Sequence, residues 1–275
     1  MSNSKPAKPL VDTAFTAEVA RFYESTLVPL IFETYAHDLA IRASNIPSKS
    51  ILEVACGTGV VTRALSKVLP DDCLITATDL NDAMVRHAEK LGAGREVDWA
   101  QADVMKLPYE SESFDLVLCQ FSVMFFPDRV AAYKEIQRVL KPGGKFMFNV
   151  WNRIEENHFA HEITECLTLR YPENPPLFLA RTPHGHGHPD EIKSDLEAAG
   201  FSKCEIIQKD AFSHAKDATV PVIAYCHGTP LRVEIEEREP GGLARVTEVV
   251  TDSIKTRFGQ GEISGKISAV VVTAS

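Results

Sequence analysis

Residues 50–59 read Ser-Ile-Leu-Glu-Val-Ala-Cys-Gly-Thr-Gly, an apolar run that ends in two closely spaced glycines. A short apolar run stopped by glycine is typical of a strand buried in a parallel sheet. From Gly59 onward the apolar residues recur at helical spacing until Pro70 closes the segment. This stretch therefore predicts a strand that enters a helix through a glycine turn.

The same unit repeats along the chain. Further strands are predicted at residues 74–78, 97–100, 114–119 and 145–150. Asn81 and Asp128 are suitable N-caps for two intervening helices, and Pro142-Gly143-Gly144 ends the second of them. Strands that alternate with helices pair in parallel through right-handed crossovers. We therefore predict an α/β fold with a doubly wound, mostly parallel sheet.

The flanking segments are less regular. Residues 15–43 have helical spacing interrupted at Pro29, which predicts two short N-terminal helices. After residue 150 the predicted elements are a helix with a loop over the sheet edge (151–188), a crossover helix (189–199), a strand (204–207), a helical insertion (about 220–258) and a last strand (267–273).

Length limits the number of domains. At about 150 residues per domain, 275 residues allow one large α/β domain with an insertion or two small domains. We expect a flexible tail at residues 1–12 and a single domain at residues 13–275. Within that domain we predict a helical cap (13–45), a cofactor-binding core (46–150), and substrate-cap elements with the last strands (151–275).

Composition narrows the class of protein. The formal charge is −9, from 29 Lys and Arg against 38 Asp and Glu, which argues against a partner such as nucleic acid or anionic lipid. No apolar run reaches the roughly 18 residues of a membrane span, and the start lacks the apolar stretch of a signal peptide, so we expect a cytoplasmic protein. The six cysteines include no C-x-x-C pair, so we expect reduced thiols without a disulfide or zinc framework.

Candidate binding residues lie at the carboxyl ends of the predicted strands, where open α/β sheets bind ligands. Gly57 and Gly59 would let the backbone approach a ligand and would present N–H groups at a helix start. A dinucleotide fingerprint needs a third glycine at position 62, where this chain has Thr62. Asp79, at the end of the second strand, can accept two hydrogen bonds from a ribose diol.

The third strand offers groups for a nucleobase. Asp103 could accept from the amino group of an adenine, and the Val104 N–H could meet a ring nitrogen. The apolar side chains of Leu80 and Met84 would flank that ring. Together with Asp79 these residues predict a nucleoside site.

Five blocks follow one another over residues 51–144: ILEVACGTG (51–59), ATDL (77–80), QADVMKLPY (101–109), SFDLV (113–117) and RVLKPGG (138–144). In this order they resemble the class I S-adenosylmethionine-dependent methyltransferases, and more narrowly the UbiE-like, type 11 branch of that family. The resemblance covers residues 51–150 well and the later residues poorly. It implies a Rossmann-like methyltransferase fold of seven strands with one antiparallel strand, for which residues 267–273 are the candidate.

The resemblance also implies S-adenosylmethionine as the cofactor and S-adenosylhomocysteine as its product. Gly57 and Gly59 would then line the methionyl part, Glu53 would lie near its amino group, and Gln120 and Phe121 would lie beside the sulfonium. The full set of cofactor-binding residues that it implies is Glu53, Ala55, Cys56, Gly57, Thr58, Gly59, Asp79, Leu80, Met84, Asp103, Val104, Gln120 and Phe121.

Methyl transfer from a sulfonium is an in-line displacement, so the protein mainly positions the reactants and excludes water. The aromatic content of the predicted cap favours a small, apolar or aromatic acceptor, with no nucleic-acid partner and no membrane span, bound by a monomer or homodimer. A catalytic base is optional. The candidates are Tyr23 and His158, with Tyr35 and His161 behind them.

Two other functional classes fit parts of the pattern. A nicotinamide-dependent oxidoreductase would share the glycine turn and the acidic ribose contact, although Thr62 and Glu53 speak against it. A catalytically silent cofactor-binding subunit would share the whole site. The segment His184-Gly185-His186-Gly187-His188 could suggest a metal, but we expect these histidines on the surface and no metal site. We expect Cys56 to pack and not to act as a nucleophile.

Overall fold

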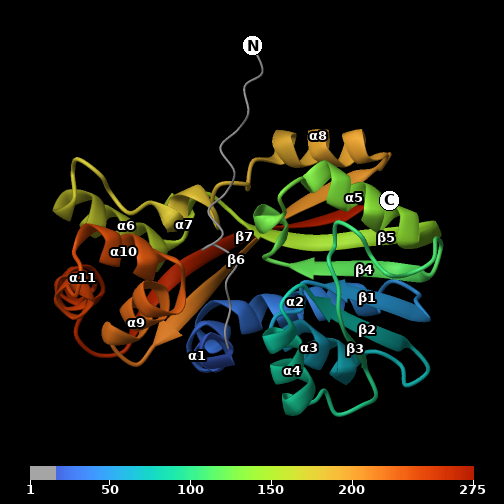
Figure 1. The fold of residues 1–275 in the computed structure, drawn as a ribbon, viewed down its shortest axis with the longest axis horizontal. Coiled ribbons are helices and arrows are strands. Elements are labelled where there is room, and N and C mark those ends of the chain that lie inside the picture. Colours follow the sequence, from blue (N-terminus) through green and yellow to red (C-terminus); the bar gives the residue numbers. More distant parts are fainter. Residues whose placement is uncertain (1–16) are drawn as a thin grey trace.

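A seven-stranded sheet runs through the molecule in the order β3-β2-β1-β4-β5-β7-β6 (Figure 1). This computed structural model describes residues 17–275, so the predicted tail at residues 1–12 lies outside the described residues. The strands are β1 (Ser50–Val54), β2 (Leu74–Asp79), β3 (Asp98–Gln101), β4 (Phe114–Gln120), β5 (Leu140–Trp151), β6 (Cys204–Ala215) and β7 (Ile263–Ala274).

Helices surround this sheet. The long ones are α1 (Ala17–Leu27), α2 (Glu33–Ser44), α3 (Val60–Val68), α4 (Asp82–Leu91), α5 (Arg129–Val139), α6 (His158–Arg170), α8 (Pro189–Ala199), α9 (Thr219–Gly228), α10 (Leu231–Arg238) and α11 (Leu243–Phe258). The short ones are η2 (Val28–Phe32), η3 (Val123–Phe125), η4 (Ile154–Glu156) and α7 (Phe178–Arg181).

The sheet is mixed. Strands β1 to β5 pair in parallel, and β7 runs antiparallel to both of its neighbours, β5 and β6. The prediction of a mostly parallel α/β sheet is confirmed in this form, with the antiparallel strand in the segment expected to supply it. Because β1 pairs with β2 on one side and β4 on the other, the strand order reverses there, which is where such sheets bind ligands.

Alternating side chains of the buried strands build two apolar layers. Ile51 packs with α2 and α3 on one face, whereas the adjacent Leu52 packs in the layer that contains α5 and α8. Figure 1 shows α5 and α8 together on the opposite side of the sheet from α3 and α4. This two-sided burial explains why the strands read as continuous apolar runs.

The N-terminal segment is almost one continuous helix. The two predicted helices are present as α1 and α2, and a π-helical turn, η2, joins them at Pro29. Proline lacks a donor N–H and clashes with the carbonyl four residues earlier, so a regular α-helix could not pass through this position unchanged. The wider turn carries Ile31 and Phe32 toward the carboxyl ends of the strands.

Several boundaries after residue 139 differ from prediction. Strand β5 begins at Leu140, before the Pro-Gly-Gly segment, and β6 extends to Ala215 because it pairs with β7 along its whole length. The predicted helix over the sheet edge is wrong in its placement: α6 packs against β7, α9 and α11. Figure 1 shows α6, α7, α9, α10 and α11 gathered at one end of β6 and β7. Among the described residues, no helix is long and apolar enough to cross a membrane.

Candidate functional site

A cavity of about 410 Å³ lies at the carboxyl ends of β1, β2, β4 and β5, under the N-terminal helices. Its lining is acidic in one part and aromatic or aliphatic in another. Glu53, Asp79 and Asp103 contribute carboxylates from the ends of three neighbouring strands. The other contributions are mainly aromatic and aliphatic and come from α1, η2, η3, α7 and α9.

The turn after β1 exposes backbone to the cavity. Ala55, Gly57 and Gly59 all have positive φ, at 54°, 55° and 81°. A Cβ on Gly57 would meet no protein atom within 4 Å, so open space adjoins this residue. Gly59 does not line the cavity; a Cβ there would lie 3.0 Å from the Trp99 ring and 3.1 Å from Ala88. Gly59 therefore serves the packing of the turn, contrary to its predicted role as a lining residue.

Asp79 holds the turn in place. Its Oδ2 accepts a hydrogen bond from Gly57 N–H at 2.9 Å, and its Oδ1 accepts from Asn81 N–H at 2.8 Å. Burial raises the pKa of Asp79, and these two N–H donors act in the opposite direction. Each carboxylate oxygen keeps a further lone pair for a ligand hydroxyl.

Glu53 is buried in the same end of the cavity. Its Oε2 accepts a hydrogen bond from the Thr62 hydroxyl at 2.5 Å. Burial raises the pKa of Glu53 to about 8, although Thr62 and the nearby Arg63 oppose that shift. Thr62 stands where a dinucleotide fingerprint has its third glycine, and here it orients the Glu53 carboxyl group in the cavity. Thr58 lies next to them, and its buried Oγ1 has no hydrogen-bond partner among the described residues.

The residues that were predicted to contact a nucleobase lie at the end of β3 and at the start of α4. Asp103 and Val104 line the cavity, and Asp103 Oδ1 accepts from Met105 N–H at 2.9 Å. Met84 is buried beside them, whereas Leu80 is 57% exposed. The structure therefore brings all four predicted residues to one end of the cavity.

Aromatic rings form the opposite part of the lining. Phe121 stacks on Trp151 with ring centroids 3.8 Å apart, and Phe32 lies 5.6 Å from Phe121. Phe121 has a φ of 49° and is fixed by hydrogen bonds from its N–H to the backbone and side-chain oxygens of Asn149. The preceding Gln120 also lines the cavity and donates to the Phe32 carbonyl at 3.5 Å.

The two base candidates have different outcomes. Tyr23 lines the cavity and stacks on Phe32 at 5.1 Å, and burial raises its pKa, so the phenol stays protonated at neutral pH. His158 is not part of the cavity. Its Nδ1 accepts from Lys266 N–H at 3.3 Å and its ring faces Phe258. The selection of His158 as a site residue is therefore not supported, because α6 begins beside Lys266, in the part of β7 that extends beyond the end of β5.

His184 is a cavity residue that the sequence analysis missed. Its Nδ1 lies 2.8 Å from the Asn152 carbonyl and its ring lies 5.9 Å from Trp151. Burial lowers the pKa of His184 to about 4. His184 is partly buried and His186 is buried, so the expected surface location is wrong for His186, holds only in part for His184 and holds for His188, which is exposed. A possible signal was the alternation with glycine, which permits a close approach to other backbone.

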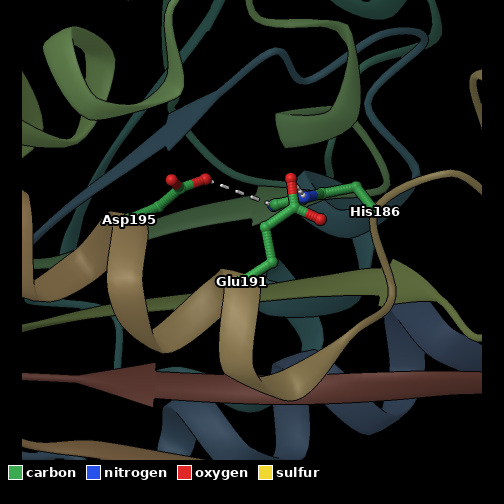
Figure 2. A group of neighbouring side chains, drawn as sticks. All are labelled: His186, Glu191 and Asp195. Atoms are coloured by element: carbon green, nitrogen blue, oxygen red, sulfur yellow. Dashed lines mark ion pairs between the residues drawn. The ribbon is translucent and has the colours of Figure 1, made fainter.

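One group of described residues has the donors for a metal ion: His186, Glu191 and Asp195, whose ligand atoms lie within 4.8 Å of one another. Figure 2 shows the two carboxylates projecting from successive turns of α8 toward the His186 ring. Arg129 already pairs with both carboxylates, at 2.5 Å from Glu191 and 2.7 Å from Asp195. The guanidinium supplies the positive charge that a metal would bring, so the group does not fit a metal site.

Known proteins resemble this chain in sequence and fold. A family model described as "Methyltransferase domain" matches residues 52–148. Ubiquinone/menaquinone biosynthesis C-methyltransferase UbiE of Shewanella halifaxensis is 28% identical over 171 residues, 57% of this chain and 68% of that protein. Cycloartenol-C-24-methyltransferase 1 of Oryza sativa is 31% identical over 198 residues, 68% of this chain. The chain spans about half of that plant protein, at 52%.

A solved structure extends the likeness beyond the matched domain. Phosphoethanolamine N-methyltransferase 2 of Haemonchus contortus, in complex with phosphomonomethylethanolamine and S-adenosylhomocysteine, has a TM-score of 0.59 and 17% identity. The superposition covers 96% of this chain and 59% of that one, and at this identity it supports the fold alone.

The sheet order, the matched domain and its homologues together indicate an S-adenosylmethionine-dependent methyltransferase. Within that class, residues 52–148 are a domain of the family described as "Methyltransferase domain", and the UbiE protein is among its homologues. The cofactor of the class is S-adenosylmethionine.

Proposed function

We propose that this chain transfers the methyl group of S-adenosylmethionine to a small, apolar or aromatic molecule. The observation that carries the proposal is the composition of the cavity. One continuous space joins three strand-end carboxylates to the stacked rings of Phe121 and Trp151. A polar, cationic donor and an apolar acceptor would therefore meet inside it.

The residues at the carboxylate end fit the cofactor. The two oxygens of Asp79 have lone pairs for the ribose hydroxyls, and the space beside Gly57 admits the methionyl chain. Glu53 would pair with the amino group, and the Thr58 hydroxyl, which has no partner in the described part of the chain, offers a further polar contact. Asp103, Val104, Leu80 and Met84 would surround the adenine. When bound, the cofactor supplies an electrophilic methyl group on a sulfonium.

The protein's own contribution would be alignment and exclusion of water. Phe32, Phe121 and Trp151 form rigid apolar surfaces against which an acceptor can stack. Holding the reacting atoms in line replaces a bimolecular encounter with a positioned displacement. Gln120 ends β4 and Phe121 follows it, at the junction of the polar and aromatic parts, so we assign both to the space beside the methyl group.

Two observations disfavour the oxidoreductase alternative. The backbone turn lacks the third glycine, and the residue in its place, Thr62, directs Glu53 into the cavity. The Glu53 carboxyl group would ionise to pair with an ammonium group, whereas it has no charge to offer a pyrophosphate. A silent cofactor-binding subunit would share these features, so activity must be tested directly.

The names of the two relatives, a ubiquinone/menaquinone biosynthesis C-methyltransferase and a cycloartenol C-24-methyltransferase, support a small apolar acceptor without identifying it. From the sequence alone we also propose a single domain over residues 13–275, a cytoplasmic location, and a monomeric or homodimeric state without nucleic acid.

The test is incubation of the protein with a metabolite extract and S-adenosylmethionine carrying an isotope-labelled methyl group, followed by mass spectrometry. We expect labelled methyl in at least one small apolar compound. Label that remains wholly in the donor would contradict the proposed activity. Label that enters RNA or protein added to the reaction would instead refute the assigned acceptor class. An Asp79→Ala variant serves as the control for methyl transfer outside the cavity.

A further inference from the structure

The loop between α7 and α8 carries His184 into the cavity in a defined position. Its two glycines, Gly185 and Gly187, leave no room for a side chain. A Cβ on Gly187 would lie 2.5 Å from the Trp151 carbonyl oxygen, and one on Gly185 would overlap the Arg181 carbonyl. The loop therefore lies directly on the backbone at the end of β5, which is the strand end beside the stacked rings.

His186 fixes the other side of this loop. Its ring is buried, with Nδ1 3.4 Å from Glu191 and Nε2 4.0 Å from Asp195 (Figure 2). Arg129 of α5 bridges the same two carboxylates of α8. Neither ring nitrogen of His186 has a hydrogen-bond partner among the described residues, so the loop is held there by the packing of the buried ring beside α8, two residues beyond His184.

The hydrogen bond of His184 determines which of its nitrogens is available. A carbonyl oxygen can only accept, so Nδ1 must donate to the Asn152 oxygen. A neutral imidazole with its proton on Nδ1 has a lone pair on Nε2. Burial keeps the ring neutral at pH 7 because it lowers the pKa of His184 to about 4. Since Nδ1 faces the backbone and the residue lines the cavity, Nε2 is the ring nitrogen left for an acceptor molecule.

We propose that His184 Nε2 receives a hydroxyl proton of the methyl acceptor, and that the acceptor is an aromatic hydroxyl compound. This inference rests on the proposed function and specifies its substrate class. The rings of Phe121 and Trp151 provide the stacking surface for the arene, and His184 beside Trp151 provides the group that recognises its hydroxyl. Among the described residues, the other polar side chains that line the aromatic part are Tyr23, Gln120, Ser122, Tyr225 and Thr229.

The step balances without another reactant. An electron pair of the acceptor forms the bond to the methyl carbon, and the carbon–sulfur bond breaks with its pair left on sulfur. The positive charge moves to the acceptor, whose hydroxyl becomes strongly acidic as the methyl group arrives. Its proton passes to Nε2 and later to solvent. Even an imidazole of low basicity suffices, because the proton is transferred only once this acidity has developed.

The test compares 1-naphthol with 1-methoxynaphthalene, which has the same rings but no hydroxyl proton. Binding of each is measured by calorimetry in the presence of S-adenosylhomocysteine. We expect the wild-type protein to bind 1-naphthol about five- to tenfold more tightly, the value of one hydrogen bond of roughly 1 kcal/mol or slightly more. In His184→Asn, which retains an amide N–H for Asn152 but lacks Nε2, the preference falls below about twofold. His188→Asn, a change at the exposed histidine of the same loop, keeps the wild-type preference.

Each other outcome has a defined meaning. Equal binding of the two compounds to the wild type, no binding of either, or an unchanged preference in a folded His184→Asn variant would overturn the inference about His184. The wild-type comparison alone is decisive should the variant fail to fold. Failure of S-adenosylhomocysteine to bind the wild type would instead refute the proposed function, so the two claims fail separately.

Discussion

Glu53 and Asp79 are neighbouring acids whose partners differ. Asp79 accepts two backbone hydrogen bonds, whereas Glu53 has the Thr62 hydroxyl. A carboxylate in a buried site with so few donors favours its protonated form, which is why the pKa of Glu53 rises to about 8. An ammonium group beside Glu53 would reverse this preference. Cofactor binding and the loss of a proton from Glu53 should therefore be linked.

This linkage predicts that the affinity for S-adenosylmethionine rises with pH. Below a pKa of about 8 in the ligand-free protein, binding must first ionise Glu53. The dissociation constant should therefore fall by roughly tenfold per unit between pH 5.5 and 7. Calorimetric titration across this range measures it. Glu53→Gln, which cannot ionise, should bind more weakly with a flat profile, and a flat profile in the wild type would contradict the pairing.

Asp79→Ala should weaken cofactor binding by about 1.5 to 3 kcal/mol, or roughly 10- to 150-fold, because charge-assisted hydrogen bonds to the ribose are lost together with the acceptor for Gly57 N–H. The dissociation constant for S-adenosylhomocysteine reports the change. Asp82→Ala is the matched control, since Asp82 pairs on the surface with Arg86 one helical turn away. Equal affinity in both variants would mean that Asp79 does not contact the ribose.

At the scale of elements, the turn from β1 to α3 contains one glycine that adjoins the cavity, Gly57, and one that packs against protein, Gly59. Gly57→Val should abolish detectable cofactor binding, because its side chain would enter space that protein atoms leave open. The positive φ of 55° adds a cost of about 1–2 kcal/mol to folding. Gly143→Val is the control, with a φ of 79°, open surroundings and no part in the cavity. It should lose similar stability in thermal melting and keep its affinity, and comparable affinity in the two variants would contradict the assignment of the turn.

The sequence was sufficient for elements whose signal is local. The apolar run before Gly57 and the helical spacing after Gly59 correctly predicted β1 and α3, and Asn81 and Asp128 cap their helices as expected. Most of β6 was not predicted because its side chains are largely exposed, and its strand conformation comes from pairing with β7. That pairing joins segments far apart in the chain.

In the candidate site, too, some residues could be predicted from local sequence and others depend on contacts between distant segments. Asp79 and Asp103 could be found because Asp79 ends β2 and Asp103 lies just after β3, and parallel strand ends meet at one edge of a sheet. His184 could not be found by that reasoning, because its position depends on contacts of its loop with Asn152 and Trp151. Distances along the chain do not encode those contacts.

At the scale of the whole molecule, the two halves of the cavity have different origins. The carboxylate end lies within residues 52–148, the segment that matches the family model. The aromatic end also draws on Tyr23, Phe178, His184 and Tyr225, which lie outside that segment. The family relationship therefore bears on the donor, and the acceptor must be inferred from this chain's own residues.

Burial of Glu53 also affects the stability of the whole protein. Because the pKa of Glu53 is higher in the folded state than in the unfolded state, its protonated form is favoured by folding. This contribution is fully present below about pH 4.5, the unfolded value, and is lost as the pH rises through about 8. Ligand-free Glu53→Gln should therefore melt at a higher temperature than the wild type at pH 8.5, with a smaller difference at pH 5. A difference that grows toward acid would show that Glu53 is ionised in the ligand-free protein.

The most direct measurement is a calorimetric titration of the ligand-free protein with S-adenosylhomocysteine and, separately, with NADH. The predicted result is saturable binding of S-adenosylhomocysteine at one site per chain, lost in Gly57→Val, and no binding of NADH. Saturable NADH binding, or a folded wild-type protein that does not bind S-adenosylhomocysteine, would contradict the assignment of this cavity to the methyl donor.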